Sequence, residues 1–211
     1  TDYEDRDGFA GNDFVLGLRG NLYGRTVLCG DMETMSENPY IACKEKYENA
    51  VGTGFFFDSD SENPYFYALS AKVLTSSEKV NLDDFLTDFS KCRYGTDAFA
   101  DDLKKLVELC YCKGSALNQA SALCARPCTQ IKHTAPFDTF QRPYDNKDLL
   151  AFVKNSLASD TKKNDNYRRD MSSVLRQVMS NALFPLYEQA TKCFFNQMID
   201  FLCFLFRLQN G

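Results

Sequence analysis

Apolar residues recur every three to four positions through much of the chain, and this spacing places them on one face of an α-helix. The pattern is clear in residues 81–92, where the apolar face consists of Leu82, Phe85, Leu86 and Phe89. Segments of the same kind cover residues 96–113, 117–125, 146–158 and 170–208, the last with an interruption at Pro185. The hydrophobic pattern therefore predicts a mainly α protein.

The pentapeptide Ser-Glu-Asn-Pro-Tyr occurs twice, at residues 36–40 and 61–65. Ser and Asn are favoured just before a helix. Pro is favoured at its first position, because the N–H group that Pro lacks would have no partner there. Both copies therefore predict helix starts, with helices from about Pro39 to Val51 and from about Pro64 to Leu74. Two explanations of the repeat stay open, a reused capping sequence and a duplicated structural unit.

Few segments are typical of β-strands. Residues 20–23 and 54–58 could pair, but two short strands alone are only marginally stable. Residues 1–35 are acidic, contain several glycines and lack a helical period, which favours an irregular arm. We therefore expect a disulfide-stapled bundle of about seven or eight helices. Its parts are an acidic arm at 1–35, a Cys-rich helical region at 36–128, a Pro-containing loop at 129–145 and a C-terminal helical region at 146–211 that packs on the first.

The stretch from Cys193 to Leu208 is the most apolar part of the chain. As a helix of roughly sixteen residues it would span about 24 Å, which is less than the ~30 Å hydrocarbon core of a membrane. Asp200 in its middle would be costly in lipid. We expect a buried core helix that Cys193 and Cys203 tie to its neighbours. The alternative is an apolar face that binds a partner helix, a lipid or a membrane surface.

The chain has nine cysteines in 211 residues, and disulfides persist mainly in oxidising compartments. Its first residue is Thr rather than Met, as in a chain whose signal peptide has been removed. These features predict a secreted, extracellular protein. An odd number of cysteines leaves at least one outside any disulfide within the chain. The disulfide candidates are Cys29, Cys43, Cys92, Cys110, Cys112, Cys124, Cys128, Cys193 and Cys203.

Cys110 and Cys112 lie two residues apart in a predicted helix, so they point about 200° apart around its axis. We expect them to bond to two different neighbours, which would make this pair a branch point. Zinc is the alternative, through Cys110, Cys112, Cys124 and Cys128, with His133 nearby. Zinc sites commonly use CxxC turns, however, whereas these cysteines lie in predicted helices.

The sequence contains no known catalytic or cofactor motif: no P-loop, GxGxxG, GxSxG or HExxH pattern is present. The sole histidine, His133, lies in a Pro-flanked loop and is expected at the surface. Adjacent carboxylates such as Asp83 and Asp84 point in different directions on a helix, so none predicts the carboxylate pair of a glycosidase. Residues 58–62 resemble part of a calcium loop but lack its central Gly. We therefore expect no enzyme activity, no metal and no cofactor.

The net charge of −5 is unevenly distributed along the chain. Residues 1–64 hold thirteen Asp and Glu and five Lys and Arg, or −8, whereas the remainder holds sixteen and nineteen, or +3. Overall acidity and interleaved Asp residues argue against nucleic-acid binding. The basic residues after position 160 form either a solvated helix face or a partner-binding surface. This basic cluster consists of Lys162, Lys163, Arg168, Arg169 and Arg176.

The run Leu109-Cys110-Tyr111-Cys112 resembles the Cys-Tyr-Cys signature of the aphid bicycle proteins, which are secreted salivary effectors. Those proteins are named for a pair of such motifs, and this chain has one in that form. The resemblance implies a non-enzymatic protein that is delivered into a host and acts by binding.

Taken with the composition, these features favour a secreted, disulfide-stabilised helical protein that works by binding. The specific hypothesis is an effector or surface antigen that acts on a host macromolecule. The alternative is a carrier of a small hydrophobic ligand, because eighteen Phe and eleven Tyr could line a cavity in a helical bundle. We expect no transmembrane segment.

Overall fold

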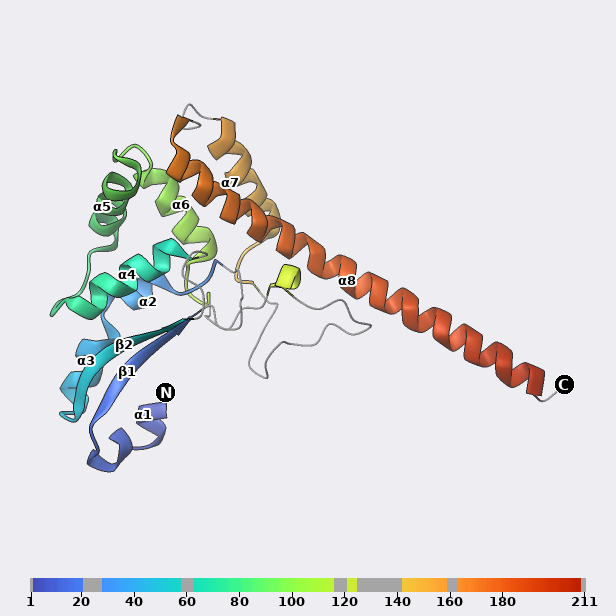
Figure 1. Cartoon of the computed structure of the whole chain (residues 1–211), viewed down its shortest axis with the longest axis horizontal. Coiled ribbons are helices and arrows are strands. Elements are labelled where there is room, and N and C mark those ends of the chain that lie inside the picture. Colours follow the sequence, from blue (N-terminus) through green and yellow to red (C-terminus); the bar gives the residue numbers. More distant parts are fainter. Residues whose placement is uncertain are drawn as a thin grey trace.

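The structure, a computed structural model, describes residues 2–20, 28–57, 63–115, 121–124, 142–158 and 163–209. Within these ranges the chain forms eight α-helices, two short 3-10 helices and two β-strands, so the protein is mainly helical. Most of the helices form one body, and the long C-terminal helix extends away from it (Figure 1).

Four amphipathic helices build most of the body, and their apolar faces meet in one hydrophobic core. They are α4 (Pro64–Thr75), α5 (Leu82–Tyr94), α6 (Ala100–Cys110) and α7 (Asn146–Ala158). The beginning of α8 (Asp165–Gln209) completes the core. Its fully buried side chains include Leu69, Leu106, Leu149 and Met171. Removing such side chains from water is the main contribution to folding, at about 25 cal/mol for each Å² of apolar surface.

Local signals define the helix ends where the sequence analysis expected them. The side chain of Asn81 accepts a hydrogen bond from the backbone N–H of Asp84 (3.1 Å), which caps the start of α5. Gly95 ends the same helix with a φ of 76°, a left-handed conformation that glycine adopts without steric cost. The helix predicted over residues 146–158 has these bounds as α7.

Both copies of the repeated pentapeptide begin a helix at their proline, as predicted. Pro39 is the first residue of α3 (Pro39–Lys46), which follows the short helix α2 (Met32–Ser36), and Pro64 is the first residue of α4. The prediction that the first of these helices reaches Val51 is wrong. The helix ends at Lys46, because Ala50 and the residues after it pair with another strand.

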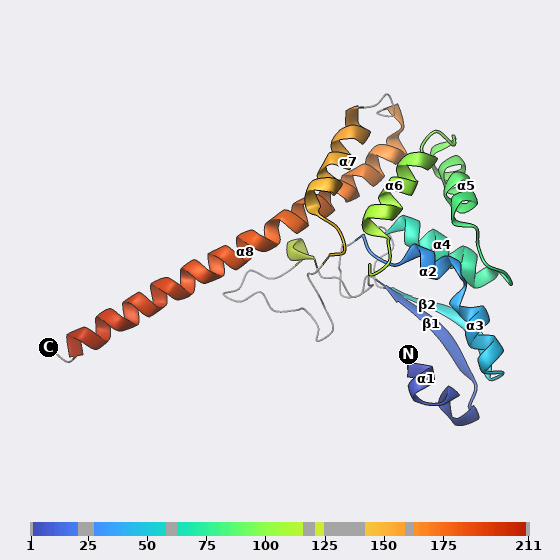
Figure 2. The same cartoon turned by 180° about the vertical axis from the view of Figure 1, so that it is seen from behind.

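The N-terminal segment, expected as an irregular arm or short strands, contains one strand of a two-stranded parallel sheet. A short helix α1 (Asp2–Asp5) and a 3-10 helix η1 (Gly8–Gly11) lead into β1 (Phe14–Gly20), which pairs in parallel with β2 (Ala50–Phe57). The connection between the strands contains α2 and α3, which lie beside the sheet (Figure 2). Parallel strands need such a crossover, so their pairing joins segments that are far apart in the sequence.

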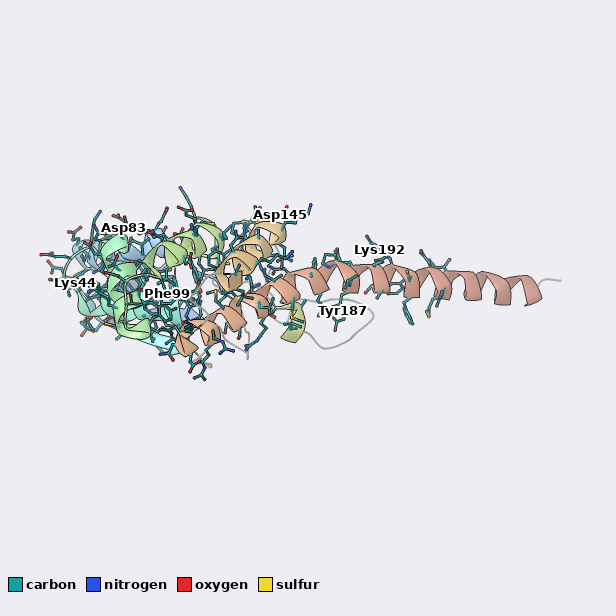
Figure 3. All side chains as sticks on the ribbon, turned by 90° about the horizontal axis from the view of Figure 1, so that it is seen from above. Lys44, Asp83, Phe99, Asp145, Tyr187 and Lys192 are labelled. Atoms are coloured by element: carbon teal, nitrogen blue, oxygen red, sulfur yellow. The ribbon has the colours of Figure 1, made fainter. Side chains whose placement is uncertain are left out.

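The C-terminal helix differs from the prediction in two ways. It runs through Pro185 without a break, and the large apolar side chains described after that residue, such as Met198 and Ile199, are exposed rather than buried. Leu186 is 59% exposed and Phe194 is 43% exposed. Figure 3 shows Tyr187 and Lys192 on the part of α8 that stands away from the body. Among the described residues, no helix is long and apolar enough to cross a membrane.

The prediction of a disulfide-stapled bundle is wrong for the cysteines whose side chains the structure describes. No disulfide joins any two of Cys29, Cys43, Cys92, Cys110, Cys112 and Cys193. Cys92 and Cys193 are exposed, whereas Cys29, Cys43 and Cys110 are buried and pack as small apolar side chains. The side chains of Cys124, Cys128 and Cys203 lie outside the described part. Packing of the amphipathic helices therefore holds the body together.

Candidate functional site

A polar pocket lies where the start of α7 meets the middle of α8 and the 3-10 helix η2 (Ala122–Cys124). It has a volume of about 220 Å³. A drug-sized ligand usually occupies 300–1,000 Å³, so this pocket fits a group of only a few heavy atoms. The described residues that line it are Ala122, Arg142, Tyr144, Asn146, Ser180, Asn181 and Phe184.

Asn181 organises the pocket wall through its side-chain amide. The amide nitrogen donates to the Tyr144 hydroxyl oxygen (3.1 Å) and to the Asn146 side-chain oxygen (3.1 Å). The Asn181 side-chain oxygen accepts a hydrogen bond from the Gln177 amide nitrogen (2.8 Å). Gln177 is buried, and its own side-chain oxygen accepts from the backbone N–H of Leu28 (2.9 Å). The wall is therefore tied to the core and held in one orientation.

Hydrogen bonds also join the other two sides of the pocket, the start of α7 and the 3-10 helix η2, to α8. The Asn146 amide nitrogen donates to the backbone carbonyl of Val178 (3.1 Å), which joins the first residue of α7 to α8. The hydroxyl groups of Ser180 and Ser121 lie 3.0 Å apart, and the backbone N–H of Ala122 donates to the Ser180 hydroxyl (3.0 Å). These bonds hold η2 against α8, so three segments distant in sequence form one rigid concavity.

Burial shifts the pKa values of the ionisable groups in and beside the pocket. It lowers the pKa of the Arg142 guanidinium, and a hydrogen bond to Tyr144 partly opposes this change. It raises the pKa of the Tyr144 hydroxyl, which bonds to Asn181 and to the Cys110 thiol. It also raises the pKa of the Cys110 thiol to about 12. At neutral pH Tyr144 and Cys110 are therefore uncharged, and Arg142 supplies the charge of the pocket.

A second polar cluster ties α5 to α8 inside the core. The Asp170 side chain is only 4% exposed. Its carboxylate accepts two hydrogen bonds from the Arg93 guanidinium (2.5 and 2.6 Å) and one from the Tyr94 hydroxyl (2.7 Å). A buried charge with this many partners is stabilised in place, and removing one partner would leave it uncompensated. We assign this cluster to the stability of the fold.

The predicted basic cluster lies at the beginning of α8, apart from Lys162, which falls outside the described residues. Lys163, Arg168 and Arg169 are exposed, and Arg168 lies 3.6 Å from the carboxylate of Asp165. Arg176 is half-buried. A partner-binding role for these residues stays a prediction.

Among the described residues, no group of three or more His, Cys, Asp or Glu side chains could hold a metal ion. Cys110 is buried in the core and Cys112, which lies beyond the end of α6, is half-exposed, so the predicted branch point is wrong. The remaining members of the zinc alternative, Cys124, Cys128 and His133, have no described side chains. The acidic segment at 58–62, considered as a calcium loop, also lies outside the described residues.

The pocket was not predicted from the sequence. Its polar residues are Arg142, Tyr144, Asn146, Ser180 and Asn181, and none of them belongs to a motif. The predicted Pro-containing loop at 129–145 supplies two of them, Arg142 and Tyr144. The pocket residues of α8, Ser180 and Asn181, follow the helical stripe of Met171, Val174 and Val178 without a distinguishing pattern.

Comparison with known proteins points to one group of enzymes. Residues 85–204, more than half of the chain, match the family described as the alpha-N-acetylglucosaminidase (NAGLU) C-terminal domain. The chain is 26% identical to human alpha-N-acetylglucosaminidase over 195 residues, which cover 90% of this chain and 26% of the human protein. It thus spans about a quarter of the length of this relative.

Two solved structures share the fold. One is a family 89 glycoside hydrolase from Clostridium perfringens in complex with PUGNAc, with a TM-score of 0.73 and 19% identity over 87% of this chain and 22% of that chain. The other is a variant of CpGH89 from Clostridium perfringens in complex with its substrate, GlcNAc-alpha-1,4-galactose. Its TM-score is 0.71, with 21% identity over 87% of this chain and 21% of that chain.

These similarities overturn the functional hypothesis drawn from the sequence. The resemblance to the bicycle proteins is wrong, because it rested on three residues around Tyr111, whereas another family matches most of the chain. The hypothesis of a non-enzymatic binding protein, whether effector, surface antigen or carrier, is wrong for the same reason. The matched relatives are glycosidases, and the solved ones are complexes with PUGNAc or with the substrate GlcNAc-alpha-1,4-galactose.

Proposed function

Because the chain belongs to the family of alpha-N-acetylglucosaminidase (NAGLU) C-terminal domains, we propose that it works as part of a glycoside hydrolase that cleaves α-linked N-acetylglucosamine. The observation that carries this proposal is the family match over residues 85–204. The similarity to the human enzyme extends to 90% of the chain and supports the same activity.

The substrate class follows from the relatives. The name of human alpha-N-acetylglucosaminidase specifies an α-linked N-acetylglucosamine as its substrate. The substrate bound to CpGH89 is GlcNAc-alpha-1,4-galactose. We propose a terminal GlcNAc in α-linkage to a second sugar as the substrate of this protein.

The polar pocket beside Arg142 is not the place for this substrate. Its volume of about 220 Å³ is too small for a disaccharide. Glycosidases use a pair of carboxyl groups about 5–10 Å apart, and no described residue that lines the pocket carries a carboxyl group. The sugar-binding cleft is therefore expected elsewhere on the protein.

The proposal is tested by comparing the hydrolysis of an α-linked disaccharide with that of its β-linked isomer. The glycoside hydrolase that contains this domain is incubated with GlcNAc-alpha-1,4-galactose and, as the matched control, with the β-linked isomer, and the released sugars are separated by chromatography. We expect release of GlcNAc from the α-linked disaccharide alone, and inhibition of this release by PUGNAc. A folded protein that cleaves neither isomer, or both equally, would contradict the proposal.

A further inference from the structure

Arg142 gives the pocket between η2, α7 and α8 a fixed positive charge. It is the only charged side chain among the described residues that line the pocket, next to the neutral side chains of Tyr144, Asn146 and Asn181. A guanidinium remains protonated throughout the physiological pH range, even where burial lowers its pKa. Charge interactions are stronger in such a half-buried site than in bulk water.

The neighbouring side chains are already oriented, so a ligand would not have to order them. Asn181 is held by its hydrogen bonds to Tyr144, Asn146 and Gln177. Tyr144 accepts hydrogen bonds from Asn181 and Arg142. A preformed wall lowers the entropic cost of binding a small ligand.

The size and chemistry of the pocket select the ligand. About 220 Å³ is too small for a sugar chain but leaves room for a group of a few heavy atoms with one or two waters. The guanidinium presents parallel N–H donors that match the oxygen atoms of carboxylate and phosphate groups. Phe184 and Ala122 add an apolar wall.

We propose that the pocket lined by Arg142, Tyr144 and Asn181 binds a small oxyanion, either a carboxylate or a phosphate group. Arg142 pairs with the anion, and the polar wall on α7 and α8 positions it. The site is separate from the proposed glycosidase chemistry, so each proposal can fail without the other.

Titration of the 15N-labelled protein with sodium acetate and, separately, with sodium phosphate tests the site. Sodium chloride keeps the ionic strength constant and serves as the reference anion. We expect saturable shifts of the side-chain N–H signals of Arg142 and Asn181 with at least one of the two oxyanions. Saturation by acetate alone identifies a carboxylate site, and saturation by phosphate alone identifies a phosphate site. Shifts that do not saturate with either anion overturn the proposal.

Three variants locate the binding. Arg142→Gln removes the charge and should abolish saturation. Arg142→Lys keeps the charge without the fork of donors and should weaken binding about ten-fold. Lys147→Gln, an exposed change at the second residue of α7, should leave binding unchanged. If Arg142→Gln fails to fold, the weaker binding expected of Arg142→Lys is the test of whether Arg142 binds the anion. Binding that is equally strong in Arg142→Lys and the parent protein would overturn the proposal.

Discussion

The two asparagines of the repeated pentapeptide show how single residues join distant parts of the fold. Asn38 and Asn63 are both fully buried, and neither side chain caps the helix that follows it. The Asn38 amide nitrogen donates to the backbone carbonyls of Val73, Ser76 and Glu78 (3.1–3.2 Å). The Asn63 amide nitrogen donates to the carbonyl of Cys29 (2.7 Å). The repeat is therefore two similar tertiary links rather than two helix caps.

Asn38→Ala should destabilise the protein by about 3 kcal/mol, because it leaves buried carbonyl groups without their donor and places Ala in a left-handed conformation. The control is Asn81→Ala, which removes an exposed helix cap and should cost about 1 kcal/mol. Urea denaturation followed by circular dichroism gives both values. Equal costs would show that Asn38 acts only as a cap.

Cys110 and Cys112 occupy unequal environments, although the branch-point hypothesis treated them alike. Cys110 is completely buried and bonds to the Tyr144 hydroxyl. Cys112 is half-exposed and makes a weak contact with the carbonyl of Leu109 (3.5 Å). The hypothesis predicted that both cysteines form equivalent disulfide bonds. In the structure, Cys110 is instead a core residue and Cys112 a surface residue.

Cys110→Ser should destabilise the protein by about 1–3 kcal/mol, because a buried hydroxyl costs more to desolvate than a thiol. Cys112→Ser should change the free energy of unfolding by less than about 0.5 kcal/mol. Chemical denaturation of the two variants side by side provides the measurement. Similar losses of 2–4 kcal/mol in both would instead restore the disulfide hypothesis.

At the scale of elements, most helices that the hydrophobic period predicted are present; of the predicted helix at 117–125, the structure describes only the 3-10 helix η2. Residues 81–92 correspond to α5 and residues 146–158 to α7, because the period and the flanking capping residues are local information. Of the two candidate strands, residues 54–58 overlap β2, whereas β1 ends at the first of the expected residues 20–23. Their pairing, such as Leu18 with Phe55, depends on a crossover that no local pattern encodes.

The prediction for the C-terminal helix failed because apolar content does not reveal what covers a surface. Its first half contributes Met171, Val174 and Val178 to the core. Its second half is richer in apolar residues but extends away from the body, as Figure 1 shows. Pro185 is compatible with a continuing helix because its ring fixes a φ close to helical values, although it removes one hydrogen bond.

Leu149→Ala and Leu186→Ala form a matched test of this description. Leu149 is fully buried on α7, so its truncation should cost about 2–5 kcal/mol. Leu186 is 59% exposed on α8, so the same change should cost less than about 1 kcal/mol. The midpoints of urea denaturation report both effects. A large loss for Leu186→Ala would indicate that another surface covers this part of α8.

At the scale of the whole molecule, buried phenols run through the core. Tyr65, Tyr111 and Tyr167 are among the largest fully buried side chains. The Tyr111 hydroxyl donates to the Asn63 side chain (2.7 Å), and the Tyr167 hydroxyl donates to Asp102 (2.8 Å). Burial raises the pKa of all three hydroxyl groups above the ordinary value near 10. The core therefore requires neutral tyrosines.

Stability should fall at alkaline pH. A group whose pKa is raised in the folded state contributes its full stability below its unfolded pKa, and this contribution is lost as the pH rises above that value. For the buried tyrosines the loss should begin near pH 10, at about 1.4 kcal/mol per pH unit for each group. Urea denaturation at pH 8, 10 and 11 measures it.

Tyr65→Phe removes one buried phenol and should make this alkaline slope shallower by about 1.4 kcal/mol per pH unit. Tyr187→Phe, on the projecting part of α8, is the control with an unchanged slope. A free energy of unfolding that stays constant up to pH 11 in the parent protein would refute the requirement for neutral tyrosines.

A glycosidase could not be predicted from neighbouring residues, because its catalytic site depends on the whole molecule. Among the adjacent carboxylates, Asp83 lies 3.1 Å from the Lys104 ammonium, and Asp102 accepts a hydrogen bond from the Tyr167 hydroxyl. Catalytic carboxyl groups face each other across a substrate, and so they come from separate segments. Secretion stays a prediction, although its argument from disulfides has lost the support of the six cysteines described here.

The sequence by itself determined the amphipathic helices and their starting points at Pro39, Pro64 and Asn81. Hydrophobic period, capping and proline geometry act within a few residues, and so they can be read along the chain. Only the tertiary structure decided the parallel pairing of β1 with β2, the burial of Asn38 and Cys110, and the meeting of Arg142 with Asn181. These features depend on contacts between distant segments, whose free energy arises only when the whole core has formed.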